Sequence, residues 1–227
     1  MEKEKCVVYK VCFVSATAVA IFTLLFVVAL VLTYDFSEWT GIENYCKSFQ
    51  PIQMLTVIPS LLLAFSYVGF VSGLHIYAPN SKKIWSQLAL SFGLLYSGIS
   101  IANYLIQLVT VIPSVQNGIT EGLGLLVSGY SNSVFFALMA SYFLMCISLF
   151  FSAFVFEKSK RYKWVRSLFA CSALAIPLFL IGSIVKIAII MMIGAMCWFI
   201  AATIGMFVLA FCFYHGEPDI RKKGLTE

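Results

Sequence analysis

The sequence predicts an all-α integral membrane protein, a bundle of six transmembrane helices with both termini in the cytoplasm. Three observations predict it: six long apolar runs, a composition that is 61% apolar and only 11% charged, and cations grouped in alternate linkers. Soluble domains carry roughly 25% charged residues. A mean hydropathy of +0.96 therefore indicates that hydrocarbon, rather than water, surrounds most of the chain.

We predict one transmembrane domain over residues 1–227, with spans at about 11–33, 54–77, 85–112, 134–156, 164–186 and 188–214. The first run follows Lys3, Lys5 and Lys10. It exceeds the roughly 7–15 apolar residues of a cleaved signal peptide, so we expect it to be retained as a span. The boundary between the fifth and sixth spans is the least defined, because residues 182–194 carry no turn signal beyond glycines.

The cations predict the orientation. Thirteen of the fifteen Lys and Arg residues fall at the N-terminus, between the second and third spans, between the fourth and fifth, or in the C-terminal tail. Clustered cations stay on the cytoplasmic side, which predicts a multi-pass membrane protein with both termini in the cytoplasm. The net charge of +5 is thus explained by topology and by contact with anionic membrane lipids. With no basic domain present, we predict no nucleic-acid partner.

The third span carries a polar stripe, with Gly93 and Tyr104 on its flank. Its members recur at spacings of four, three, four and three residues: Tyr96, Ser100, Asn103, Gln107 and Thr110. Such spacing places them within about an 80° arc of one helix, opposite an apolar face. The stripe is therefore expected to face protein or a wet cavity in the outer half of the membrane.

Two interpretations of this stripe stay open. Amides and hydroxyls commonly hydrogen-bond between transmembrane helices, so the stripe can serve packing alone. Alternatively it lines a site that binds or passes a small neutral or amphipathic ligand, because amides and phenols satisfy hydroxyl or amide groups without a counter-charge. The candidate ligand-binding residues are Tyr96, Ser100, Asn103, Tyr104 and Gln107.

Lys186 is a further candidate, because it lies at the outer end of the fifth span, on the side that cations avoid. In one interpretation its ammonium group reaches the interface while its methylene chain stays in the apolar layer. In the other it counters an anionic ligand, or pairs with Glu121 or with an acidic residue of the first external loop.

Small residues predict close helix packing, and they also suggest an alternative function, docking to another chain. Gly69 and Gly73 form a GxxxG pattern in the second span, and the fourth span aligns Ala137, Ser141, Ser148 and Ser152. Such faces let helix backbones approach each other. If they dock another chain, the protein is a non-catalytic structural or accessory subunit of a homo- or hetero-oligomer.

We predict no enzymatic activity, no cofactor and no metal. His75 and His215 lack further ligands at metal-binding spacing, and no nucleophile stands beside a base in a known motif. Of seven cysteines only Cys46 is expected outside the cell, so the sequence does not predict a disulfide framework.

Part of the sequence resembles a known family. The segment NYLIQLVTVIPS at residues 103–114, with IPSLLLA at 58–64 and HIYAP at 75–79, is similar to an uncharacterised family of small six-span membrane proteins from bacteria and archaea. The resemblance covers residues 52–156. It implies a prokaryotic protein of the cell membrane and places the polar stripe in the recognisable segment. Because the family has no assigned activity, the resemblance implies no functional residues.

Overall fold

The chain folds into an all-helical bundle. The structure is a computed structural model that describes residues 2–33, 39–128, 130 and 132–223. No strand occurs in these ranges. Within them, six helical segments are long and apolar enough to cross a membrane: Cys6–Thr33, Met54–Tyr77, Asn80–Gln116, Val134–Val155, Lys163–Ile184 and Ala188–His215. The prediction of an all-helical chain with six helices able to span a membrane is thereby confirmed, whereas the cytoplasmic position of both termini stays a prediction.

Only the first span is one uninterrupted α-helix, α1 (Glu2–Thr33). A short helix, α2 (Ile42–Ser48), lies in the loop that follows it. The second span joins a 3₁₀ turn, η1 (Pro51–Thr56), to α3 (Val57–Tyr77). The third span contains four elements: η2 (Asn80–Lys82), α4 (Lys83–Ile106), a π-helical turn η3 (Gln107–Val111) and α5 (Ile112–Gln116).

The other three spans are also divided. The fourth span consists of α6 (Val134–Met139) and α7 (Ser141–Val155). The fifth span consists of α8 (Lys163–Cys171), the 3₁₀ turn η4 (Ser172–Leu174) and α9 (Ala175–Ile184). The sixth span consists of α10 (Ala188–Ile200), the π-helical turn η5 (Ala201–Gly205) and α11 (Met206–Lys223). Pro177 explains the η4 turn, because it lacks the N–H that would bond the carbonyl four residues earlier.

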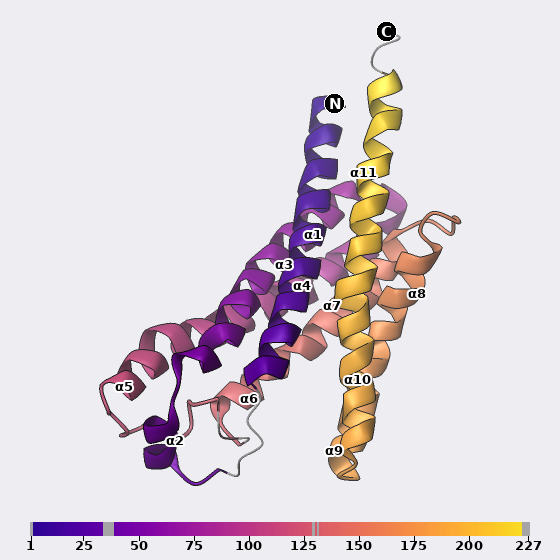
Figure 1. Cartoon of the computed structure of the whole chain (residues 1–227). Coiled ribbons are helices and arrows are strands. Elements are labelled where there is room, and N and C mark those ends of the chain that lie inside the picture. The colour runs from indigo at the N-terminus through magenta and orange to yellow at the C-terminus, as the bar shows by residue number, and fades with distance from the viewer. Residues whose placement is uncertain (1, 34–38, 129, 131, 224–227) are drawn as a thin grey trace.

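The six spans form a closed ring. Each packs on the next along the chain, and α11 of the sixth span returns to pack on α1. The start of α1 and the end of α11 lie at the same end of the bundle, whereas α2, α5 and α6 gather at the other (Figure 1). The α9–α10 hairpin extends away from this second group. Its apolar side chains are largely exposed, as expected for a lipid-facing surface, with Ile184 at 80%.

The small-residue faces are used inside the chain. A side chain at Gly73 would meet Cys12 Sγ of α1 at 2.9 Å, and one at Gly69 would meet Ser15 Cβ at 3.4 Å. On the fourth span, Ser148 donates to the Ala89 carbonyl oxygen of α4 at 2.6 Å. The glycine face of the second span and the buried part of the fourth-span face (Ser141, Ser148 and Ser152) therefore pack within the chain, whereas Ala137 is exposed.

Gly93 marks the point where three spans meet. A Cβ atom built there would lie 2.8 Å from Val71 Cγ1, 3.0 Å from the Tyr67 ring and 3.1 Å from Ser148 Oγ. Real Cβ contacts are longer, so α3 and α7 can approach α4 at this level only because the side chain is absent.

We expect Gly93→Ala to lower the free energy of unfolding by about 1–3 kcal/mol, because the added methyl overpacks the contact between α3, α4 and α7. Gly98→Ala is the matched control, since it lies on the same helix with nothing within 4 Å of its Cβ position. That control should be neutral or stabilising by up to about 1 kcal/mol, as alanine is the better helix former. Unfolding of both variants in mild detergent measures the difference, and equal stabilities would contradict this account of the packing.

Candidate functional site

The polar stripe of α4 faces protein, as the sequence predicted. The side chains of its five candidate residues are at most 2% exposed: Tyr96, Ser100, Asn103, Tyr104 and Gln107. The opposite face of the helix is exposed and apolar, with Val109 at 71%. A helix in hydrocarbon gains by burying its amides and hydroxyls against other helices. The stripe therefore sets the rotation of α4 in the bundle.

The predicted stripe is wrong at its last member, Thr110, which is exposed while Val111 is fully buried. The cause is the π-helical turn η3, in which the Ile112 N–H bonds the Gln107 carbonyl oxygen five residues back. A π turn inserts one extra residue, so the buried face continues at position 111 instead of 110. Pro113 lies just beyond and cannot complete the regular α-helical bond to Val109.

Three stripe residues bond to other segments. The hydroxyls of Ser100 and Ser141 lie 2.9 Å apart. Asn103 Nδ2 donates to the Phe135 carbonyl oxygen of α6 at 3.3 Å, and Gln107 Nε2 donates to the Leu126 carbonyl oxygen of the following loop at 2.8 Å. The stripe thus holds α4 against the fourth span and against the loop that leads to it.

A chain of phenols continues the network. The Tyr104 and Tyr142 hydroxyl oxygens are 2.9 Å apart, and Tyr104 donates to Met139 Sδ at 3.3 Å. Because Tyr104 has one proton, this arrangement makes Tyr142 the donor of the shared bond. Tyr142 is half-buried. Its ring packs against Trp198 and Phe26, at centroid distances of 4.9 Å and 6.0 Å.

Two polar atoms of the stripe have no partner. The Tyr96 hydroxyl and Gln107 Oε1 are buried without a hydrogen bond to any described residue. Tyr96 is enclosed by other aromatic rings, with Tyr67 and Tyr142 both at 5.3 Å. Buried polar atoms are nearly always hydrogen-bonded in native proteins, so each exception requires an explanation.

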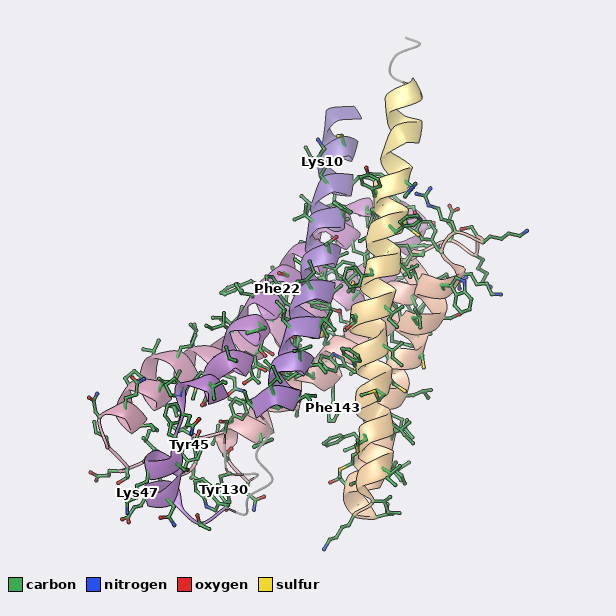
Figure 2. The ribbon with its side chains drawn as sticks, in the orientation of Figure 1. Lys10, Phe22, Tyr45, Lys47, Tyr130 and Phe143 are labelled. Atoms are coloured by element: carbon green, nitrogen blue, oxygen red, sulfur yellow. The ribbon has the colours of Figure 1, made fainter. Side chains whose placement is uncertain are left out.

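A small cap, absent from the sequence-based prediction, covers this end of α4. Its core is formed by four buried residues, Val111, Val115, Leu123 and Val127, against which α2 and its flanks pack. Trp39 stacks on Tyr130 at 5.1 Å, and the Tyr45 hydroxyl lies 3.4 Å from Ser128 Oγ. Burial raises the pKa of Tyr45. Figure 2 shows Tyr45, Lys47 and Tyr130 together at this end of the molecule.

Glycines allow the cap to turn sharply. Gly118 and Gly122 have φ angles of 70° and 74°, in the left-handed region that residues with a Cβ rarely adopt. The loop between α5 and α6 is irregular in the residues that the structure describes. Its apolar side chains, however, are spaced too unevenly to predict that α2 packs on them.

Lys186 is not brought together with the stripe. It lies in the α9–α10 turn, which stands apart from α5 in Figure 1, and its side chain is exposed. Its φ of 56° and the bond from the Ile187 N–H to the Gly182 carbonyl oxygen form a Schellman motif, in which Lys186 takes the position usually held by glycine. This residue ends α9. Its proposed pairing with an anionic ligand stays a prediction.

The described residues contain no cluster of three or more His, Cys, Asp or Glu side chains that could hold a metal ion. His75 Nδ1 instead lies 3.0 Å from Ser86 Oγ, and the Lys83 ammonium donates to the His75 carbonyl oxygen. His75 therefore joins the end of α3 to the start of α4.

Fold and site together define the chain as a polytopic α-helical membrane protein with a buried, uncharged polar network between its third and fourth spans. No family model, curated protein or solved structure matches the chain. The family resemblance seen in the sequence therefore stays a prediction.

The bond between Tyr104 and Tyr142 should be measurable by a double-mutant cycle. We expect Tyr104→Phe and Tyr142→Phe each to destabilise the protein, and their coupling energy to be about 0.6–1.7 kcal/mol, the range found for hydrogen bonds between membrane helices. Tyr214→Phe is the control, because Tyr214 is 59% exposed. Chemical unfolding in detergent measures all four free energies, and additive single effects would show that the two phenols are uncoupled.

Proposed function

We propose that this polytopic membrane protein binds a small neutral or amphipathic ligand at the polar network between α4 and α7. The site consists of Tyr96, Ser100, Asn103, Tyr104 and Gln107, joined by Tyr142 of α7. This network lies in the half of the bundle that carries α2, α5 and α6. According to the charge distribution, that half faces the outside of the cell.

The observation that carries this proposal is the pair of unpartnered atoms, the Tyr96 hydroxyl and Gln107 Oε1. Packing between helices accounts for Ser100, Asn103 and Tyr104, because each has a partner on the fourth span. Packing does not account for a phenol and an amide oxygen that are buried without a hydrogen-bond partner, because each such group costs about 1–3 kcal/mol of stability. Because these residues are eleven positions apart, about 16 Å along the span, a ligand would need two separate polar groups, one that accepts from the Tyr96 hydroxyl and one that donates to Gln107 Oε1.

The chemistry of the network restricts the ligand class. None of its side chains is a cation or a carboxylate, so a charged ligand would enter hydrocarbon without compensation. Phenols, hydroxyls and amides instead match alcohols, amides and uncharged head groups. The half-buried Tyr142 contacts Phe26 and Trp198, and this aromatic surface suits the apolar part of an amphipathic molecule.

The π-helical turn supports the same location. η3 begins at Gln107, the stripe residue that also bonds the cap through Leu126. π-helical turns are rare, occur mostly as single turns inside α-helices, and are frequently found at functional sites. Movement of the cap would act directly on the Gln107 side chain, which gives the site a route for opening.

Tyr96→Phe separates ligand binding from folding, because it removes a hydroxyl that has no protein partner. We expect the variant to be at least as stable as the parent, with a gain of up to about 1–3 kcal/mol from losing a buried unsatisfied group. Binding of a photoreactive monoacylglycerol, a neutral amphiphile with free hydroxyls, should weaken about tenfold, the loss of roughly one hydrogen bond.

Photolabelling in nanodiscs, competed by unlabelled monoacylglycerol, measures that binding, and the labelled peptides should come from α4 and α7. Thr110→Val is the matched control, because Thr110 lies on the same span with its side chain exposed. Undiminished, competable labelling of the Tyr96→Phe variant would place the binding site elsewhere.

The orientation can be tested at Cys46, which lies in α2 of the cap. In a variant that keeps Cys46 as its only cysteine, we expect a membrane-impermeant maleimide to label intact cells. A variant that keeps only Cys6 should react only after permeabilisation. Burial raises the pKa of Cys46, so its labelling rate should rise at a more alkaline pH than the labelling rate of a fully exposed thiol. The reverse pattern of accessibility would invert the proposed topology.

A further inference from the structure

A second candidate site lies at the opposite end of the bundle from the cap. The loop between α7 and α8 and the first turns of α8 form an open depression of about 510 Å³, lined by Lys158, Ser159, Lys160, Lys163, Arg166, Ser167 and Ala170. Figure 1 places this loop on the side of the termini, and Figure 2 shows nitrogen-tipped side chains projecting from it. The lining contains four cations and no acidic residue.

The cations of this segment divide into two groups. Arg161 donates to the Cys212 carbonyl oxygen of α11, and Arg166 Nε donates to the Ala153 carbonyl oxygen of α7 at 3.3 Å. These bonds fix the loop on the bundle. Lys158, Lys160 and Lys163 are exposed and make no hydrogen bond or ion pair with the described residues. Their charges therefore face the depression or solvent without protein partners.

The position of the depression suits a molecule at the membrane surface. Trp164, the second residue of α8, is 66% exposed. Tryptophan side chains concentrate at the level of lipid head groups, where an apolar ring and a polar N–H are both accommodated. On the neighbouring α4, Trp85 packs on Phe154 at 5.0 Å near the same end of α7.

We propose that this depression binds a phosphate group. Lysine ammonium groups and the remaining guanidinium N–H groups of Arg166 supply charge-assisted hydrogen bonds to phosphate oxygens, and Ser159 and Ser167 supply hydroxyl donors. Two sources offer this chemistry: the head group of an anionic phospholipid, and a soluble phosphate compound of the cytoplasm. The site is independent of the polar network between α4 and α7, which contains no charged group.

The test compares two variants of equal charge. Lys158→Gln, Lys160→Gln and Lys163→Gln together remove the three unpaired cations, leaving Arg166 and its structural bond intact. Arg221→Gln, Lys222→Gln and Lys223→Gln together remove three cations from the C-terminal tail. The full-length proteins are purified in a neutral detergent and titrated with dioctanoyl phosphatidic acid, dioctanoyl phosphatidylcholine or inorganic phosphate, with the unfolding temperature as the readout.

We expect phosphatidic acid to stabilise the parent protein, and its apparent Kd to rise about 10- to 100-fold in the loop variant, since each lysine near a membrane surface contributes about 1 kcal/mol. The tail variant should bind like the parent. A response to phosphatidic acid alone assigns the site to a lipid head group, and an equal response to inorganic phosphate assigns it to a soluble compound. The proposal is overturned if the parent responds to neither, if the loop variant binds unchanged, or if the tail variant loses as much affinity.

Discussion

The pairing of α4 with the fourth span depends on the cost of polar side chains in hydrocarbon. An amide or hydroxyl that faces lipid loses its hydrogen bonds to water and gains nothing in return. The stripe on α4 therefore has to meet partners on another helix, and it finds them at Ser141, Tyr142 and the Phe135 carbonyl oxygen. Gly93 lies on the same face and admits α3 as well. Three of the six spans are thus positioned by one face of one helix.

The cations at the end of the bundle that carries both termini have a second role besides indicating the topology. Lys82 donates to the Phe156 carbonyl oxygen at the end of α7, and Lys83 donates to the His75 carbonyl oxygen in the last turn of α3. The last carbonyls of a helix lack intrahelical partners, and its C-terminal dipole attracts cations. Residues that a sequence analysis counts as topological markers therefore also complete the helix ends.

Much of this architecture could be predicted because hydropathy and helical periodicity follow directly from burial. The six apolar spans and the buried side of α4 could be predicted in this way. Thr110 could not be placed, because the π turn before Pro113 shifts the helical phase by one residue. Tyr142 was missed because it lies in an apolar run whose own pattern gives no sign of a polar contact. Lys186 could not be placed at the left-handed end of α9, because that position is usually held by glycine and the sequence has lysine there.

The locations proposed for the two ligands follow from one comparison, between the free energy of placing a charged side chain in hydrocarbon and that of placing a hydrogen-bonded neutral one there. A charged side chain at the centre of a bilayer costs about 2.5–3.5 kcal/mol even on insertion scales, whereas a paired amide or phenol costs far less. A site between α4 and α7 is consequently limited to neutral donors and acceptors, and to ligands of the same kind. Recognition of an anion requires cations that remain hydrated until the ligand arrives, and exposed lysines at the rim of α8 meet that requirement.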